Sequence, residues 1–423
     1  MSFLQEMRWR GLVADHTPDL EELLAAERVT GYIGFDPTAA SLHVGSLLPI
    51  LNLARLQRAG HRPIAIAGGG TGLIGDPSGK RTERTLLDLP KVEENLRGIE
   101  AQLRHFLDFD DAETGALLVN NADWLCKIPL LDFLRDVGKH FTVNRMVTQE
   151  SVKLRLESEV GLSFTEFSYS LLQAYDFLEL YDRHGCKLQM GGTDQWGNIL
   201  FGADLIRRLR EDKAHGLVSP LITNASGTKF GKTEAGTVWL DPQLTPPYHY
   251  YQFWLNTGDD DAVRYLRYFT FLGQEEIEQL AAELAEAPQE RAAQRRLASE
   301  LTRMTHGEEA LSRAQRVTDL LFGHRGDLFA DDLLEAFGDA PSTEITRADF
   351  DAGLTLSQLL TDAGAAPSRN QARRLIDQGG IYVNEERVGE DVELGEAHTV
   401  ENQVILLRRG KKSYSVVRIV GQR

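Results

Sequence analysis

The stretch Val29-Thr30-Gly31-Tyr32-Ile33-Gly34-Phe35-Asp36-Pro37-Thr38, followed five residues later by His43-Val44-Gly45-Ser46, decides the fold class. Its apolar part, residues 29–35, predicts a short buried strand that ends at Asp36-Pro37. The periodic segment 46–59 then predicts a helix. A short strand that leads directly into a helix is the first half of a βαβ unit.

The same succession recurs further along the chain. Residues 63–67 form a second short apolar run, bounded by three glycines. Residues 188–190 form a third, which ends at Gly191-Gly192 before a predicted helix at 198–210. Short apolar strands with glycine-rich ends and intervening helices are typical of a parallel sheet, so we expect a Rossmann-like α/β catalytic domain.

The character of the chain changes after this part. Strand signals stop beyond residue 248, and periodic segments at 275–284 and 289–304 predict helices. Residues 326–352 hold eight acids and one arginine, whereas residues 353–423 hold ten lysines or arginines against nine acids. We therefore expect the α/β domain at 1–223, an all-helical domain at 224–325, an acidic linker at 326–352 and a small α+β domain at 353–423.

Composition excludes several classes of protein. The chain has 423 residues, 63 acids against 46 lysines and arginines, and a net charge of −17. It has no run of ~18 apolar residues, and its N-terminus lacks the pattern of a secretory signal. Cys126 and Cys186 are too few for a disulfide framework, which predicts a reducing, cytoplasmic compartment. Because there is no long apolar run, we do not expect the chain to span a membrane. The acidic balance argues against indiscriminate nucleic-acid binding, so an RNA partner would need a local basic patch.

The carboxyl end of the first strand is one candidate ligand site. Ligands of open parallel sheets bind at such ends, and the N-terminus of the helix after His43 presents N–H groups that suit a phosphate. A tight turn with Thr38 or Ser46 as helix cap explains the same residues, and on them alone it is the better interpretation.

A glycine-rich segment after the second strand gives two false leads. Gly70, Gly72 and Gly75 match the dinucleotide pattern GxGxxG, but the turn residues after Asp76 leave no place for the helix that pattern requires. A phosphate-binding Walker loop fails as well, because Lys80 is followed by arginine. What remains is a loop with exposed backbone, with Asp76, Lys80 and Arg84 close by.

Three further groups could carry chemistry. Tyr169, Gln173 and Asp176 form one polar stripe on the predicted helix 163–180, and Tyr32 could point into the same space. A structural hydrogen-bond network and a polar ligand pocket explain this stripe equally well. Asp194 after Gly191-Gly192 suits a ribose hydroxyl or caps a helix. Lys229-Phe230-Gly231-Lys232-Thr233 offers two lysines for phosphates or only solvated charge.

Together these segments resemble the bacterial tyrosyl-tRNA synthetases, a group of class I aminoacyl-tRNA synthetases. The resemblance rests on motifs in the same order along the chain, namely Gly34-Phe35-Asp36-Pro37-Thr38, His43-Val44-Gly45, residues 71–80, 163–176 and 191–198, and Lys229-Phe230-Gly231-Lys232-Thr233. The family activates L-tyrosine with ATP, which carries Mg²⁺ on its phosphates, and transfers tyrosyl to the 3′-terminal adenosine of tRNA(Tyr). Because the attacking carboxylate is already ionised, activation depends on positioning and electrostatics.

The resemblance also implies roles for individual residues. Tyr32 and Asp176 would bind the substrate phenol, Asp76, Tyr169 and Gln173 its ammonium group, and Gln195 would lie near its carboxylate. The catalytic group would comprise Thr38, His43, Lys80, Arg84, Lys229 and Lys232. The nucleotide would be held by Gly34, Asp36, His43, Gly45, Ser46, Gly191, Gly192, Asp194 and Lys232. No dedicated metal site is expected.

The sequence departs from the family pattern at two places. Ser46 stands where the signature usually has a second histidine, so the ribose contact would come from its hydroxyl or from water. The flexible loop reads KFGKT instead of the general KMSKS, although both lysines are kept.

Three regions outside the catalytic motifs also resemble parts of the family. Residues 124–162 resemble an insertion that forms a homodimer interface, and residues 248–325 resemble the family's helical anticodon-side domain. Residues 354–418 resemble an S4-type RNA-binding domain. In that domain the resemblance points to Arg369, Arg373, Arg374, Arg408, Arg409, Lys411 and Lys412 as RNA-binding residues, with a solvated basic face as the alternative. An inactive RNA-binding relative and an NAD-dependent dehydrogenase are weaker alternatives. DNA is not expected as a partner.

Overall fold

The computed structural model describes residues 1–76, 89–156, 161–223, 230–233, 236–321, 328–337, 340–410 and 413–421. The chain divides into two compact units, Met1–Thr305 and His306–Arg423, which are described separately.

A six-stranded sheet forms the centre of the first unit. Its order is β1-β6-β5-β2-β3-β4, and every neighbouring pair is parallel except β1 with β6. The strands are β1 (Asp15–His16), β2 (Thr30–Phe35), β3 (Arg62–Ala67), β4 (Leu117–Asn120), β5 (Cys186–Gly192) and β6 (His215–Ser219). The predicted Rossmann-like parallel sheet is confirmed.

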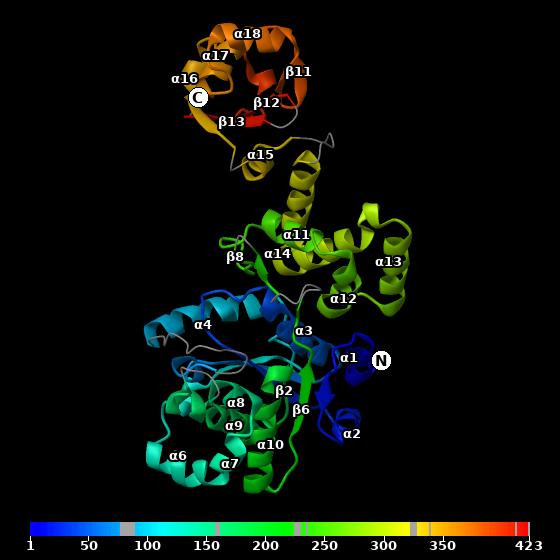
Figure 1. Cartoon of the computed structure of the whole chain (residues 1–423), viewed down its shortest axis with the longest axis vertical. Helices are drawn as coiled ribbons and strands as arrows, with labels where there is room; N and C mark the ends of the chain where they lie inside the picture. Colours follow the sequence, from blue (N-terminus) through cyan, green and yellow to red (C-terminus); the bar gives the residue numbers. More distant parts are fainter. Residues whose placement is uncertain are drawn as a thin grey trace. The chain divides into compact units, whose positions relative to one another are not determined.

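The topology reverses direction between β2 and β5. From β2 the chain crosses to β3 through α3 (Val44–Arg58), whereas from β5 it crosses the opposite way to β6 through α10 (Trp196–Arg210). Right-handed crossovers in opposite directions place these helices on opposite faces of the sheet (Figure 1). The carboxyl ends of β2 and β5 therefore flank a crevice of the kind in which open α/β sheets bind ligands.

The polar stripe predicted on residues 163–180 lies on α9 (Phe164–His184). Ser163 caps the helix by accepting a hydrogen bond from the Glu166 N–H, and Gly185 ends it in the left-handed conformation. Its apolar face, including Phe177, packs into a core cluster with Tyr32, Ile64 and Phe201. This packing turns the opposite, polar side of α9 toward the crevice.

Further helices complete the first unit. Before and between the strands lie α1 (Phe3–Trp9), α2 (Leu20–Ala26) and α4 (Leu89–Leu103). Short helices follow β4, at α5 (Ala122–Leu125), α6 (Leu130–Asp136), α7 (Val143–Met146) and α8 (Glu150–Leu156). The predicted helical region contains α11 (Pro247–Leu255), α12 (Asp259–Phe269), α13 (Gln274–Glu286) and α14 (Ala292–Leu321), the last interrupted by non-helical Gly307 near the boundary of the units.

The second unit contains a five-stranded sheet in the order β11-β10-β12-β13-β9. Its strands are β9 (Ser342–Thr346), β10 (Ile381–Val383), β11 (Glu386–Val388), β12 (Val404–Arg409) and β13 (Ser413–Val420). Its helices are α15 (Ala330–Ala336), α16 (Arg347–Asp351), α17 (Leu356–Asp362) and α18 (Arg369–Asp377), the last three of which lie near the strands in Figure 1.

The structure differs from the expected acidic linker at 326–352. In this stretch β9 pairs in parallel with β13, and Leu333 of α15 packs with Val404 and Val416. The described part of the stretch therefore belongs to the folded unit. Several of its acids are exposed, whereas Asp332 is 1 % exposed and pairs with Arg316 at 2.6 Å. Among the described residues, no helix combines the length and the apolar character that crossing a membrane requires.

Candidate active site

A buried phenol and a buried carboxylate occupy the crevice beside β2. The Tyr32 side chain is 2 % exposed, and its Oη has no hydrogen-bond partner in the described structure. Asp176 of α9 is 4 % exposed, and burial together with the Asp176 charge raises the pKa of Tyr32 well above its ordinary value. A buried hydroxyl without a partner is costly, which marks this as a position that a polar ligand group completes.

Two residues that the sequence did not single out hold the Asp176 carboxylate. Trp124 Nε1 donates to Oδ1 at 2.7 Å, and Asn121 Nδ2 donates to Oδ2 at 2.9 Å. Asn121 is held in turn, because its Oδ1 accepts from the Gly70 N–H at 2.7 Å. Burial raises the pKa of Asp176 to about 7, although both hydrogen bonds act to lower it. The carboxyl group therefore titrates near neutral pH.

A second polar cluster lies further along the same crevice. Gln195 donates through Nε2 to Asp76 Oδ2 at 2.9 Å and accepts at Oε1 from Gln173 Nε2 at 3.2 Å. Asn198 Nδ2 donates to Gln173 Oε1 at 3.1 Å, a position that the sequence analysis left without a role. Tyr169 is buried on the same helix as Gln173. The structure thus brings Asp76, Gln173 and Gln195 together in one hydrogen-bonded cluster.

A pocket with a cavity volume of about 480 Å³ adjoins the carboxyl ends of β2, β5 and β6. Five predicted nucleotide residues line it: His43, Gly45, Gly191, Gly192 and Asp194. The other lining residues are largely apolar and include Ile33, Leu48, Pro49, Leu221 and Ile222. Apolar walls with polar groups at one edge suit a ring system attached to a sugar and charged groups.

His43 begins α3 and caps it with its own ring. The ring Nδ1 accepts a hydrogen bond from the Gly45 N–H at 2.9 Å, so in the neutral ring the proton lies on Nε2. This tautomer makes Nε2 a donor, as a phosphate partner requires. Ser46 on the first turn of α3, Gly34 and Thr38 are not among the residues that line the pocket. Asp36 directly follows β2, and its carboxylate lies close to Gly68. A Cβ added to that glycine would be 3.3 Å from Asp36 Oδ1.

The comparisons with known proteins agree with this geometry. Residues 24–323 match the family model for class I tRNA synthetases of the W and Y type, and residues 332–417 match the model for the C-terminal domain of tyrosine--tRNA ligases. The tyrosine--tRNA ligase of Roseiflexus castenholzii is 54 % identical over 424 residues, which cover 99 % of this chain and 100 % of the relative. The chain belongs to the tyrosine--tRNA ligase family. The tyrosine--tRNA ligase of Geobacillus stearothermophilus is 53 % identical over the same coverage.

Solved structures of the family share the fold. A C-terminally truncated mitochondrial tyrosyl-tRNA synthetase from Aspergillus nidulans is 32 % identical with a TM-score of 0.69, covering 76 % of this chain and 94 % of that one. A tyrosyl-tRNA synthetase from Archaeoglobus fulgidus, 16 % identical with a TM-score of 0.53, covers 74 % of this chain and 99 % of that chain. At that identity it supports the fold alone.

The KFGKT segment, residues 229–233, is anchored by its phenylalanine. The Phe230 ring packs against four aromatic rings of α11 and α12, including Tyr265 at 5.2 Å and Phe269 at 5.3 Å between centroids. Gly231 has φ +85°, and a Cβ there would lie 3.1 Å from Val44 Cγ2 at the start of α3. Only glycine adopts this backbone and this close approach without strain. Lys80, Arg84 and Lys229 lie outside the described residues, as does the side chain of Lys232.

The predicted RNA-binding residues differ in how far their charges are already paired. Arg369, Arg373 and Arg374 are exposed on α18, and Arg373 pairs with Asp391 at 2.9 Å. Arg408 pairs with Glu385 at 2.8 Å and lies 3.6 Å from the Tyr382 ring centroid. Arg409 is exposed and donates to the Ala365 carbonyl at 2.8 Å. Lys411 and Lys412 lie outside the described residues.

The described parts of the chain contain no group of three or more His, Cys, Asp or Glu side chains that could hold a metal ion.

Proposed function

We propose that this chain activates L-tyrosine with ATP and transfers the tyrosyl group to the 3′-terminal adenosine of tRNA(Tyr), with the residue roles given below. The observation that carries the proposal is the pair formed by the unpartnered Tyr32 Oη and the buried Asp176 carboxylate. A substrate phenol can accept from Tyr32 and donate to Asp176, so both buried groups gain a partner at once.

Activation is a displacement at phosphorus. The L-tyrosine carboxylate attacks the α-phosphorus of ATP, which enters with Mg²⁺ on its phosphates, and the bond to pyrophosphate breaks. Asp76, Tyr169 and Gln173 hold the ammonium group, while Gln195, which bonds Asp76, places its amide near the carboxylate. The substrate is thereby fixed at both ends, which converts binding into alignment for attack.

Negative charge moves onto pyrophosphate as the bond breaks. The protonated Nε2 of His43 and the cationic groups of Lys80, Arg84, Lys229 and Lys232 stabilise this charge, with Thr38 as a further donor. Asp194 holds the ribose, while Gly45, Gly191 and Gly192 line the pocket and allow close approach of the nucleotide. Gly34, Asp36 and Ser46 complete the proposed nucleotide contacts from the neighbouring strand end and helix start.

Specificity against phenylalanine follows from the same pair of groups. Phenylalanine has the same ring as tyrosine without the hydroxyl, so it leaves Tyr32 and Asp176 without that partner. An unsatisfied buried polar group costs about 1–3 kcal/mol, and more when it is charged. Asp176→Ala should therefore lose most of the discrimination between tyrosine and phenylalanine in adenylate formation, and equal discrimination in variant and parent would contradict this assignment.

The C-terminal unit supplies the proposed tRNA surface. Arg369, Arg374 and Arg409 are exposed there, with Arg373, Arg408, Lys411 and Lys412 as further candidates. Phosphate contacts of this kind give an affinity that falls with salt. The transfer step follows when a ribose hydroxyl of the bound tRNA attacks the adenylate carbonyl and releases AMP.

We also propose a homodimer formed through the region at 124–162. Leu130 and Leu131 of α6 are 70 % and 77 % exposed, and Phe164, just beyond this region, is 78 % exposed. Large apolar side chains that are this exposed favour a protein partner. Sedimentation of the full chain tests the dimer, and a monomer at micromolar concentration would contradict it.

We also propose a reducing, cytoplasmic setting, which the free, exposed thiol of Cys126 supports.

Exchange of labelled pyrophosphate into ATP tests the catalytic proposal. We expect exchange that depends on L-tyrosine, and its absence would leave an inactive RNA-binding relative as the better interpretation. Exchange driven by L-tryptophan instead would place the chain in the other branch of its class, because the matching family model covers both.

A further inference from the structure

Two polar residues of the nucleotide pocket have no role in the reaction described above. Asn52 of α3 is 4 % exposed and Ser219, the last residue of β6, is 5 % exposed, and both line the pocket. Asn52 Nδ2 donates to Ser219 Oγ at 3.0 Å. Among the described residues, this is the one hydrogen bond made by the Ser219 hydroxyl.

A buried arginine fixes the direction of this hydrogen bond. Arg55, one turn after Asn52, is 0 % exposed and donates through Nη1 to Asn52 Oδ1 at 3.0 Å. A guanidinium group only donates, so the Asn52 oxygen must face Arg55 and its NH₂ group must face Ser219. Because Ser219 Oγ then accepts, its own proton is directed elsewhere.

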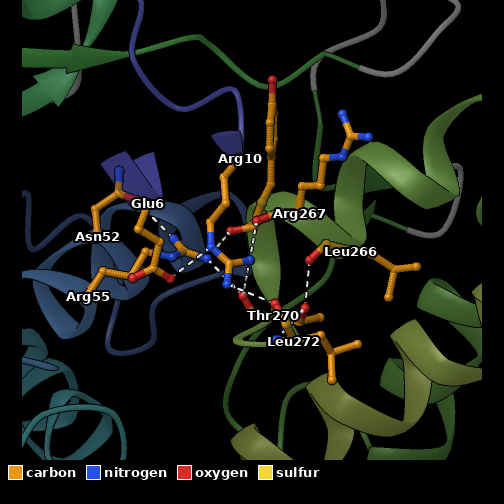
Figure 2. A network of polar contacts seen from close by, with 9 residues as sticks. Glu6, Arg10, Asn52, Arg55, Leu266, Arg267, Thr270 and Leu272 are labelled. Carbon is orange, nitrogen blue, oxygen red and sulfur yellow. Dashed lines mark hydrogen bonds and ion pairs between the residues drawn. The ribbon is translucent and has the colours of Figure 1, made fainter. Parts of the chain in front are cut away.

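Arg55 is itself held rigidly from the other side. Its Nη2 donates to the carbonyls of Tyr268 at 2.7 Å and Thr270 at 3.1 Å, at the C-terminus of α12 (Figure 2). Arg10 donates to the same Thr270 carbonyl at 3.0 Å. These carbonyls carry the negative end of the helix dipole, which stabilises the buried charge. Burial lowers the pKa of Arg55 to about 9, so it remains a cation at neutral pH.

We propose that Ser219 is a nucleotide-binding residue of the activation step, and that Arg55 and Asn52 are positioning residues that make its hydroxyl a donor to the adenosine of ATP. The adenine ring nitrogens and the ribose 2′-oxygen are acceptors of this kind. Ser46, where the family usually has a histidine, does not line the pocket, whereas Ser219 and Asn52 do. The inference rests on the proposed function, because it names a contact within the ATP site.

The first test is Ser219→Ala in the full chain, read by tyrosine-dependent pyrophosphate exchange. Loss of one neutral hydrogen bond predicts that the KM for ATP rises about 3- to 10-fold, with the KM for L-tyrosine unchanged. Ser415→Ala, a buried serine of the second unit, is the matched control and should leave both constants unchanged. An unchanged KM for ATP overturns the inference, whereas absence of exchange in the parent overturns the proposed function instead.

ATP analogues identify the acceptor and separate a direct contact from a structural effect. We expect one of 1-deaza-, 3-deaza-, 7-deaza- and 2′-deoxy-ATP to bind the parent more weakly than ATP does, by the same factor by which Ser219→Ala weakens ATP binding. The Ser219→Ala variant should bind that analogue and ATP equally well. If every analogue has the same effect in parent and variant, Ser219 does not touch the nucleotide and the inference is wrong.

The second test reverses the direction of the hydrogen bonds and keeps the serine. In Asn52→Asp a carboxylate accepts from both Arg55 and Ser219, which turns the serine proton away from ATP. We expect a rise in the KM for ATP comparable to that of Ser219→Ala, and no further rise when the two changes are combined. Effects that multiply in the double variant would show that the residues act separately and would overturn the positioning role.

Discussion

With Asp176 binding the substrate phenol as proposed, its ionisation should make the affinity for L-tyrosine depend on pH near neutrality. Burial raises the pKa of this carboxyl group to about 7 in the free protein. In the proposed complex the substrate phenol donates to Asp176, as Trp124 and Asn121 already do. An ionised carboxylate accepts three such hydrogen bonds better than a carboxylic acid, one of whose oxygens carries a proton of its own. Binding of L-tyrosine therefore favours the ionised form, and affinity should rise as the pH increases through 7.

The size of the effect follows from the fraction ionised. With a pKa of about 7, roughly one tenth of the carboxyl groups are ionised at pH 6 and roughly nine tenths at pH 8. The dissociation constant should therefore be about tenfold larger at pH 6 than at pH 8. The ammonium and carboxylate groups of the substrate do not change charge in this range, so they add no slope.

Equilibrium dialysis with labelled L-tyrosine, without ATP, measures this directly. Asp176→Asn is the control because an amide does not titrate there, and its weaker binding should be flat between pH 6 and 8. A change of less than twofold in the parent over this range would show that the carboxyl group stays ionised and would refute the reasoning. An equal slope in Asp176→Asn would assign the pH dependence to another group.

Three other outcomes follow from the geometry. Trp124→Phe removes a hydrogen bond that lowers the pKa of Asp176, so the midpoint of the tyrosine-binding profile should move above pH 7. Gly231→Ala places a Cβ 3.1 Å from Val44 Cγ2 in a left-handed backbone that costs about 1–2 kcal/mol, so single-turnover adenylate formation should slow while L-tyrosine binding by dialysis is unchanged. A chain ending at Leu321 should retain pyrophosphate exchange and lose tRNA charging in a filter assay, and full charging would assign tRNA binding to the first unit.

The sheet and the edge that binds ligands could be predicted because their signals are local. The three strands that the sequence predicted, β2, β3 and β5, are short apolar runs ended by glycine or proline. Ligand groups at the carboxyl ends of such strands converge regardless of loop lengths. The stripe of Gln173 and Asp176 followed from helical spacing alone. The sequence pattern left a structural network and a pocket equally plausible, and the unpartnered Tyr32 Oη is what favours the pocket.

The residues that hold the Asp176 carboxylate could not be predicted in the same way. Asn121 and Trp124 lie more than fifty positions from it, and nothing in their own neighbourhood indicates a carboxylate partner. The one local signal is a pair of asparagines at the end of an apolar strand, Asn120 as its last residue and Asn121 after it, because such a strand end lies at the ligand edge. The acidic stretch at 326–352 misled for a related reason, since β9 reaches its partner β13 only by a parallel pairing about seventy residues away.

The helix α12 connects the helical region with the nucleotide pocket at three points. Its C-terminal carbonyls hold Arg55 and, through Asn52, the pocket wall. Arg264 on its first turns donates to the carbonyl of Thr223, a pocket residue, at 2.7 Å, and Tyr265 and Phe269 pack on Phe230 of the KFGKT segment. One helix therefore touches Thr223 before the KFGKT segment, Phe230 within it, and α3, whose N-cap is His43. A displacement of α12 would change the nucleotide contacts together, while the tyrosine contacts on α9 lie outside this set.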